Sequence, residues 1–380
     1  MKQDTLLAQA GARRDPATGA ITMSICPSAA FQHPALGQST GFDYSRTTNP
    51  TRKALEETMA ALEGGARAVA FASGLAAVDA VMRLFSPGDA VLVTEDIYGG
   101  SYRLFERFGR THGLHFVYID TSKTENIAEG LKRNKFKGIF AELPTNPLLK
   151  VADLKALGTL AKEYGLLLVV DNTFLTPVLC RPLDFGADIT LYSATKYLGG
   201  HNDLIAGLAV AKTQETGERL AFIQNAAGAI LSPFESWLLL RSLKTLPLRL
   251  KKHEENALTV AEFLQKHRAA RNVRYPGLPT DPGHALLTAQ ASGYGGIISF
   301  DAASRAEAER ILASVRVFLF AESLGACESL ITYPHIQTHA DIPPEARERA
   351  GLTERLLRLS VGLEDPSDLL DDLSYALQGP

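Results

Sequence analysis

Apolar runs alternate with amphipathic segments through the middle of the chain. The runs at 68–71, 90–94 and 165–173 are apolar almost throughout, a pattern typical of parallel strands that are buried on both faces. Over 74–85 and 153–164, apolar residues recur every three or four positions, as they do along one face of a helix. This alternation predicts an α/β fold with a doubly wound, mainly parallel sheet.

The pattern divides the chain into three predicted regions. Residues 1–45 contain many small residues and little periodicity, so we expect an extended arm. Residues 46–242 carry the alternation and are expected to form a larger, cofactor-binding domain, whereas residues 243–380 are expected to form a smaller α/β domain. The amphipathic stretch 235–267 is expected to bridge the two domains as a long helix, interrupted at Pro247.

Composition limits the classes of protein to consider. At 380 residues, with 46% hydrophobic and 21% charged residues, the chain can bury a large core and is expected to form two domains. Its net charge of −3 argues against nucleic acid or an anionic membrane as partner, and no apolar run reaches transmembrane length. The N-terminus shows no signal peptide, so we expect a cytoplasmic location. Cys26, Cys180 and Cys327 are too widely spaced to predict a disulfide framework or a metal site.

Lys196 leaves an apolar strand among hydroxyl side chains, Ser193 and Thr195, just before the glycine pair at 199–200. Most single lysines are solvated surface charges. A lysine held among apolar neighbours instead loses hydration and is more easily deprotonated, and only the free amine is a nucleophile. Lys196 is therefore a candidate reactive amine.

Asp171 ends the apolar run at 165–173. Ligands of open α/β sheets gather at the carboxyl ends of the strands. A carboxylate there can keep a ring nitrogen protonated, which is the partner that pyridoxal phosphate (PLP) needs to act as an electron sink. The alternative is that Asp171 simply starts the next loop.

Two glycine-containing turns complete the candidate site. Ser73, Gly74 and Leu75 open the predicted helix at 74–85, where free backbone amides and the helix dipole favour an anion, although Ser73 alone also suits an ordinary N-cap. Tyr98 precedes two glycines, which would let the backbone approach a planar ring; a surface turn is the alternative. An anion cradle, an acid for a ring nitrogen and a reactive lysine together indicate PLP.

Longer motifs recur in a fixed order along nearly the whole chain. They are Tyr44-Ser45-Arg46-Thr47-Thr48-Asn49-Pro50-Thr51-Arg52, Ser73-Gly74-Leu75, Tyr98-Gly99-Gly100, Glu142-Leu143-Pro144-Thr145-Asn146-Pro147, Asp171-Asn172-Thr173-Phe174, Ser193-Ala194-Thr195-Lys196-Tyr197, Ala321-Glu322-Ser323-Leu324-Gly325, Thr338-His339-Ala340-Asp341 and Arg358-Leu359-Ser360-Val361-Gly362. On these motifs the chain resembles the Cys/Met-metabolism family of PLP-dependent enzymes. It departs from the usual family pattern at Thr48, Leu75 and Ala326-Cys327.

The resemblance implies the PLP-dependent transferase fold of type I, with a mainly parallel, seven-stranded sheet flanked by helices and a smaller C-terminal α/β domain. It implies that Lys196 bonds PLP and acts in catalysis with Tyr98 and Asp171, and that Glu142 is structural. It further implies a homotetramer with shared active sites, in which the arm packs on a neighbouring subunit and supplies two phosphate contacts. The implied cofactor contacts are Tyr44, Arg46, Ser73, Gly74, Leu75, Tyr98, Asn146, Asp171, Ser193, Thr195 and Lys196.

The resemblance also assigns substrate contacts. Arg358, supported by Ser323, would clamp the substrate α-carboxylate. Arg103 would take a distal carboxylate or ester, and Asp43 and Glu322 would favour a distal ammonium. That pattern suits cystathionine or its precursors.

The activity that the resemblance implies is γ-replacement on an activated homoserine ester by cysteine, as in cystathionine γ-synthase. Cystathionine γ-lyase, cystathionine β-lyase and O-acetylhomoserine-type sulfhydrylase activities stay open as alternatives. From other classes, an aminotransferase of the same fold or a non-catalytic regulator would also bind the cofactor, although no DNA-binding segment is evident for a regulator. A nicotinamide enzyme is disfavoured because no Gly-x-Gly-x-x-Gly follows the first strand.

Overall fold

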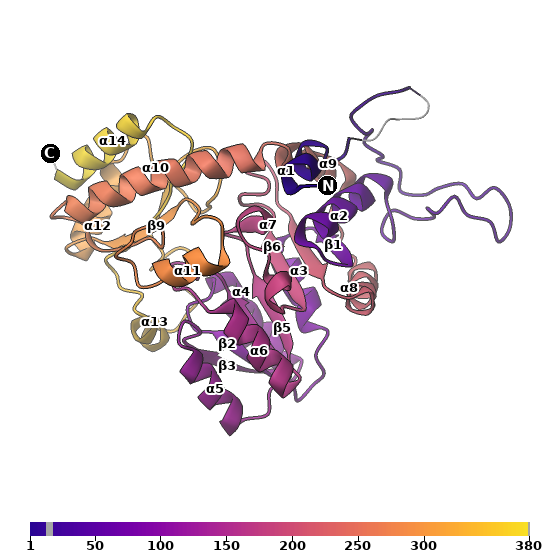
Figure 1. The fold of residues 1–380 in the computed structure, drawn as a ribbon, viewed down its shortest axis with the longest axis horizontal. Helices are drawn as coiled ribbons and strands as arrows, with labels where there is room; N and C mark the ends of the chain where they lie inside the picture. The colour runs from indigo at the N-terminus through magenta and orange to yellow at the C-terminus, as the bar shows by residue number, and fades with distance from the viewer. Residues whose placement is uncertain (13–17, 379–380) are drawn as a thin grey trace.

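A seven-stranded sheet forms the centre of the larger part of the chain, with strand order β1-β7-β6-β5-β4-β2-β3. The computed structural model describes residues 1–12 and 18–378 (Figure 1). All the strands run parallel except β7, which is antiparallel to both of its neighbours. The strands are β1 (Arg67–Phe71), β2 (Ala90–Thr94), β3 (His115–Ile119), β4 (Gly138–Glu142), β5 (Leu167–Asp171), β6 (Ile189–Ser193) and β7 (Gly207–Ala211). The predicted α/β class and mainly parallel seven-stranded sheet are confirmed.

The central strands are buried on both faces, as their apolar runs predict. Along β5, Leu168 and Val170 pack into one hydrophobic cluster and Val169 into another on the opposite face, because successive strand side chains point to opposite sides. Helices α2, α5 and α6 contribute to the first cluster and α3 and α8 to the second. The helical elements of this region are α2 (Pro50–Glu63), α3 (Gly74–Met82), α4 (Gly99–Arg103), a π-helical turn (Leu104–Gly109), α5 (Thr124–Arg133), α6 (Leu154–Tyr164), α7 (Thr176–Leu179), a 3-10 turn (Pro182–Phe185) and α8 (Gln214–Ala227).

Two helix predictions can be compared with the structure in detail. The helix expected over 153–164 is confirmed as α6: the Asp153 side chain caps it by accepting from the Ala156 amide at 2.9 Å. The helix expected over 74–85 ends earlier, at Met82. Beyond it the Phe85 amide bonds the carbonyl of Met82, three residues back, so the last turn tightens and leaves the α-helical path.

A second, five-stranded sheet has the order β10-β11-β12-β9-β8, and α10, α12 and α14 pack on it through one hydrophobic cluster. Its strands are β8 (Arg271–Arg274), β9 (Ile297–Asp301), β10 (Leu319–Phe320), β11 (Leu330–Thr332) and β12 (Leu356–Ser360). The helices that follow in this part of the chain are α10 (Leu246–Lys266), α11 (His284–Gln290), α12 (Arg305–Ser314), α13 (Pro344–Ala350) and α14 (Pro366–Gln378). The helix before them, α9 (Pro233–Leu243), packs on α2 and belongs to the first hydrophobic cluster of the large sheet. The domain boundaries at residues 46 and 243 stay predictions.

The long bridge expected over 235–267 is two helices, with α10 running from the large sheet to the small one (Figure 1). The break lies beside Pro247, the second residue of α10. Proline is tolerated there because the first turn of a helix has no partner for its amide. Among the described residues, none of the helices combines the length and apolarity needed to cross a membrane.

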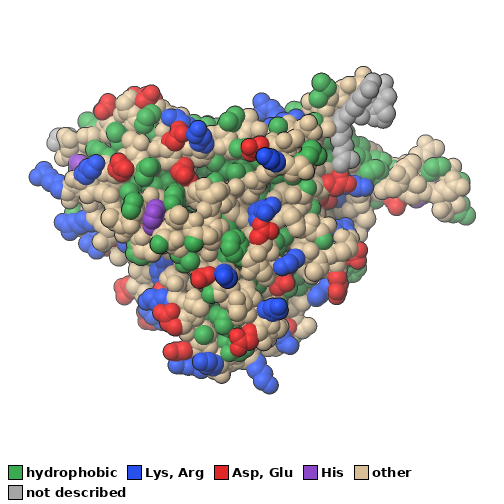
Figure 2. Space-filling view, viewed as in Figure 1, with side chains coloured by type: hydrophobic (Ala, Val, Ile, Leu, Met, Phe, Trp, Pro, Cys, Tyr) green, Lys and Arg blue, Asp and Glu red, His purple; other side chains and the backbone are tan. Residues whose placement is uncertain are grey.

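The N-terminal arm is only partly extended. Its first residues form a short helix, α1 (Gln3–Ala8), whose Leu7 is buried against the body of the protein, so the prediction of an extended segment is wrong there. The chain before α2 projects from the body, as Figures 1 and 2 show, while residues 13–17 of the predicted arm lie outside the described residues. At its base the buried Arg52 donates to the carbonyl oxygens of Ser45, Arg46 and Thr47 at 2.8, 3.3 and 3.2 Å.

Candidate active site

A cavity of about 270 Å³ opens at the carboxyl ends of β4, β5 and β6, between the two sheets. Segments far apart in sequence meet there because the carboxyl ends of parallel strands lie on one edge of a sheet. The predicted site residues that line the cavity are Ser73, Gly74, Leu75, Tyr98, Asn146, Asp171, Ser193, Thr195, Lys196, Glu322, Ser323 and Arg358.

The N-terminus of α3 forms one wall of the cavity. The Ser73 hydroxyl caps the helix by accepting from the Ala76 amide at 3.1 Å. Within the described residues the amides of Gly74 and Leu75 have no hydrogen-bond partner. A Cβ at Gly74 would lie 3.0 Å from the Ser193 Cβ, so glycine lets the helix start come close to β6. Two free amides beside a hydroxyl at a helix N-terminus form the predicted anion cradle.

Asp171 presents one free carboxylate oxygen to the cavity. Its Oδ1 accepts from the amide and the hydroxyl of Thr173, at 3.0 and 2.6 Å. Its Oδ2 has no partner among the residues that the structure describes. Burial raises the pKa of Asp171, against the opposing effect of the Thr173 hydrogen bonds, so a cationic partner at Oδ2 would stabilise the charged form.

Thr173 is a residue that the sequence reasoning quoted without giving it a role. Besides binding Asp171, its hydroxyl accepts from the Ser193 amide at 2.8 Å. It therefore ties the Asp171 strand to the start of the Lys196 turn. The spacing of Asp171 and Thr173 is a local signal that could have revealed it, because aspartate side chains commonly bond the backbone two residues on.

Lys196 lies in the turn that follows β6, and its Nζ donates to the Ser323 Oγ at 3.2 Å. No carboxylate in the described chain forms an ion pair with it. The pKa of Lys196 is lowered to about 8, mainly by burial and to a smaller extent by the Arg358 charge, while Glu322 opposes both. The structure therefore places a readily deprotonated amine in the lining of the cavity.

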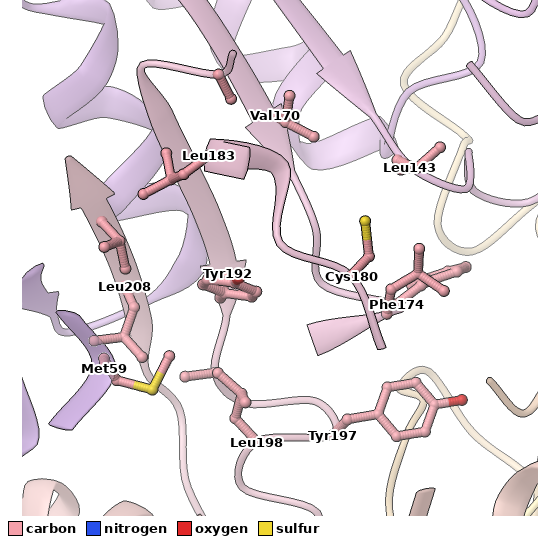
Figure 3. Close-up of a cluster of buried hydrophobic side chains, with 14 of the residues drawn as sticks. Met59, Leu143, Val170, Phe174, Cys180, Leu183, Tyr192, Tyr197, Leu198 and Leu208 are labelled. Atoms are coloured by element: carbon pink, nitrogen blue, oxygen red, sulfur yellow. The ribbon is translucent and has the colours of Figure 1, made fainter. Parts of the chain in front are cut away.

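The turn that carries Lys196 is anchored on both sides. The Thr195 hydroxyl accepts from the Ala206 amide at 3.0 Å and donates to the Ala206 carbonyl oxygen at 3.3 Å. The next residues, Tyr197 and Leu198, lie in the buried cluster shown in Figure 3. The buried Arg249, which the sequence reasoning missed, donates to the Tyr197 carbonyl oxygen at 2.7 Å. These contacts hold the lysine stem in one place.

The lowered pKa of Lys196 predicts how PLP capture by the apoprotein depends on pH. Only the free amine reacts, so the capture rate should rise about fivefold from pH 7 to pH 8 and level off near pH 9 for a pKa of about 8. Stopped-flow absorbance measures this rate, with a simple alkylamine as the control for the titration of PLP itself. A rate that still climbed tenfold per pH unit above pH 9 would contradict the assignment.

Arg358 is a fully buried guanidinium that forms no ion pair with any of the described residues. It donates to Asn146 Oδ1 at 2.8 Å, to the Ser323 carbonyl oxygen at 2.8 Å and to the Thr332 hydroxyl at 3.0 Å. Its Nε is buried and has no hydrogen-bond partner, and burial lowers the pKa of Arg358 to about 10. A buried charge is costly unless it is paired, so this cavity is built to receive an anion.

Asn146 is oriented by the same contact. Because its Oδ1 accepts from Arg358, its amide nitrogen is the side-chain group that remains to donate into the cavity. The backbone of Asn146 is held as well, because its carbonyl oxygen lies 2.9 Å from Nε2 of His339. Burial lowers the pKa of His339 to about 4, so its ring stays neutral in the ordinary pH range. The predicted donor to a ring hydroxyl is therefore held by Arg358 of β12 and by His339 in the loop between β11 and α13.

Tyr98 stands at the N-terminus of α4, where its amide donates to Glu142 Oε2 at 3.0 Å. The two following glycines have different uses: Gly99 lies against the Thr338 carbonyl and Gly100 against the Tyr98 ring, and neither leaves room for a Cβ. Burial raises the pKa of Tyr98, with the Arg103 charge opposing it. Glu142 is wholly buried and its pKa is raised well above the ordinary value by burial and by Asp171.

Four predicted site residues do not line the cavity of this chain. Arg103 forms an ion pair with Asp341 at 2.6 Å. Asp43, Tyr44 and Arg46 lie on the projecting arm: Asp43 bonds His33 at 3.1 Å, and Arg46 donates to the Asn225 carbonyl at 2.6 Å. A role for the arm residues in a neighbouring subunit stays a prediction.

The groups that line the cavity fit PLP. The free amides of Gly74 and Leu75 match a phosphate, the free Oδ2 of Asp171 matches a protonated ring nitrogen, and Lys196 supplies an amine of lowered pKa. The Asn146 amide matches a ring hydroxyl.

Comparison with known proteins gives relatives along the whole chain. A cystathionine γ-lyase of Bacillus subtilis is 47% identical over 378 residues, covering 100% of both chains. A cystathionine γ-synthase/O-acetylhomoserine (thiol)-lyase of the same organism is 48% identical and covers 98% of this chain and 96% of its own. A cystathionine β-lyase of Lactococcus lactis is 44% identical and covers 98% of both chains.

A solved structure and a family model agree with these relatives. The crystal structure of cystathionine γ-synthase from Xanthomonas oryzae pv. oryzae, in complex with aminoacrylate and cysteine, superposes with a TM-score of 0.97 at 42% identity, covering 100% of this chain and 98% of that one. Residues 4–378 match the model of the Cys/Met metabolism PLP-dependent enzymes. The resemblance seen in the motifs is thus confirmed: the chain belongs to the Cys/Met metabolism family of PLP-dependent enzymes, and PLP is its cofactor.

Proposed function

We propose that this protein makes cystathionine by joining the thiol of cysteine to the γ-carbon of an activated homoserine ester. The observation that carries the proposal is the charge pattern of the cavity. At one side lies Arg358, a buried cation that has no ion-pair partner in the described part of the chain, and Glu322 is an exposed acid that lines the same cavity. The α-carboxylate of an amino acid matches the first, and the ammonium of an incoming cysteine matches the second.

The residues divide the chemistry among them. When bound, PLP supplies an electron sink for the charge left at the substrate α-carbon. Arg358 binds the α-carboxylate and orients the α-C–H bond, and the free amine of Lys196 removes that proton. Asp171 keeps the ring nitrogen protonated through its free Oδ2. Tyr98 lines the same cavity as Lys196 and serves the later proton transfers, in which the ester leaves as its acid and the thiol loses a proton to add at the γ-carbon.

The arm residues belong to the same proposal. Tyr44 and Arg46 do not line the cavity of their own chain. The segment before α2 projects from the body (Figure 1), and Arg52 holds the carbonyls at its base. We assign Tyr44 and Arg46 to the phosphate of a neighbouring subunit, with Asp43 close to its substrate. The active unit is then at least a dimer, and we propose a homotetramer.

Product analysis tests the proposed activity. The holoenzyme is incubated with O-acetyl-, O-succinyl- or O-phosphohomoserine, each with and without cysteine, and separately with cystathionine. We expect cystathionine to accumulate from at least one ester, and only with cysteine present.

Two other outcomes would replace the proposal. Rapid release of cysteine, oxobutyrate and ammonia from cystathionine would identify a γ-lyase, the activity named for the Bacillus subtilis relative that aligns over its full length. Homocysteine, pyruvate and ammonia would identify a β-lyase. Both lyases share the first deprotonation by Lys196 with the synthase. Only the products therefore distinguish these three activities from one another and from an aminotransferase.

A further inference from the structure

Arg103 and Asp341 join the two sheets of the protein at the edge of the active-site cavity. Arg103 ends α4 in the large sheet region, and Asp341 lies in the loop between β11 and α13. Arg103 NH1 lies 2.6 Å from Asp341 Oδ2, and the two side chains are 49% and 44% exposed. In the part of the chain that the structure describes, this is the only polar contact of the Arg103 guanidinium, so its other two nitrogens are free.

The loop that carries Asp341 is fixed against the cavity. Thr338 lines the cavity, and its carbonyl packs so closely on Gly99 that no side chain fits between them. The next residue, His339, is fully buried and bonds the Asn146 carbonyl oxygen. The packing of this loop therefore fixes the position of Asp341 next to α4.

The Arg103 charge is felt inside the cavity. It is the strongest single charge acting on Tyr98, which lines the cavity, ahead of Glu322 and Arg358. Ser101, on the same short helix as Arg103, lines the cavity as well. A carboxylate that reached the outer end of the cavity would meet the two free nitrogens of Arg103 and could bind them in a bidentate manner.

We propose that Asp341 is a built-in competitor for the distal carboxylate of the substrate: it occupies Arg103 in the substrate-free protein and is displaced when a substrate carboxylate binds there. The inference rests on the proposed function only in so far as the substrate is an amino acid held by Arg358. Displacement is feasible because a single-contact ion pair between half-exposed side chains is weak. Asp341 thereby lowers the affinity for every ligand with a distal carboxylate and leaves ligands without one unaffected.

The opposite role, in which Asp341 holds Arg103 in the position that the substrate needs, makes a prediction of opposite sign. Removing a competitor tightens binding, whereas removing a support weakens it. The Asp341→Asn substitution keeps the shape and removes the charge, so the direction of the change decides between them.

Binding of two unreactive amino acids to the holoenzyme tests the proposal by calorimetry. L-2-Aminoadipate and L-norleucine have the same chain length, and only the first ends in a carboxylate. For Asp341→Asn we expect the Kd of aminoadipate to fall about two- to fivefold, the range set by an exposed ion pair, with norleucine unchanged. Asp184→Asn is the matched control, because Asp184 also pairs with a neighbouring arginine, Arg181, at 2.5 Å on the exposed surface, and it should change neither Kd.

Arg103→Gln completes the set and should abolish the preference of the protein for aminoadipate over norleucine. The proposal is overturned if Asp341→Asn weakens aminoadipate binding, if it shifts both ligands equally, or if the wild-type protein does not prefer aminoadipate at all. These measurements need no turnover. A protein that failed to make cystathionine would refute the proposed function and still give a clear result here.

Discussion

A Lys196→Ala protein is expected to lose at least about 10⁴-fold in kcat/KM, because the substitution removes both the amine that bonds PLP and the base that takes the α-proton. The fold should survive, since the Lys196 turn is held by the bonds of the Thr195 hydroxyl to the Ala206 backbone and by Arg249 rather than by the lysine. Steady-state product formation measures the loss, and circular dichroism confirms the fold.

Lys162→Ala is the matched control for this variant. Lys162 lies on the exposed side of α6, and its loss should leave kcat/KM within the error of the wild-type value. A Lys196→Ala protein that kept a tenth or more of wild-type turnover would show that another group performs both roles.

Replacing Arg358 is expected to have the second-largest effect, on substrate binding. Removing one partner of a buried ion pair costs about 3–5 kcal/mol, so kcat/KM of an Arg358→Gln protein should fall by about 10²-fold to a few thousandfold, mainly through KM. The physical reason is that the guanidinium is buried with an unpartnered Nε and has no carboxylate of its own chain bonded to it in the described residues.

Two further variants separate charge from geometry. Arg358→Lys keeps the cation and loses the planar fork, so its KM should lie between the KM of the wild-type protein and that of Arg358→Gln. Arg310→Gln changes another arginine that bonds backbone carbonyls, with NH1 2.7 Å from the Ala376 oxygen, and it should leave KM unchanged. If Arg358→Gln lowered kcat with an unaltered KM, the α-carboxylate would have to bind elsewhere.

Much of the large sheet follows from periodicity because its strands are buried on both faces. A continuous apolar run such as 165–173 has no other good environment than a sheet covered by helices on each side, and the structure shows Val169 and Val170 in opposite clusters. The gathering of Asp171 and Lys196 is equally predictable, since Asp171 ends β5, Lys196 follows β6, and the carboxyl ends of the two strands share one edge of the sheet.

The sequence pattern does not reveal contacts between half-exposed side chains that lie far apart along the chain. The pairing of Arg103 with Asp341 joins residues 238 positions apart, and neither side chain has a local pattern that names its partner. The end of α3 at Met82 was also missed, because the apolar spacing continues through Phe85 while the backbone tightens. The short helix α1 was missed because a segment of six residues is too short to show a helical periodicity.

We assign Lys196, in a cavity built from Asp171, Arg358 and the start of α3, as the residue that bonds PLP. Reduction of the holoenzyme with borohydride, followed by proteolysis and mass spectrometry, tests it most directly, because reduction fixes the cofactor to the side chain that holds it. We predict that the cofactor mass is found on the peptide containing Lys196, in near-stoichiometric amount, and is absent from that peptide in the unreduced protein. Recovery of the cofactor mass on any other lysine of the chain, with the Lys196 peptide unmodified, would contradict the account.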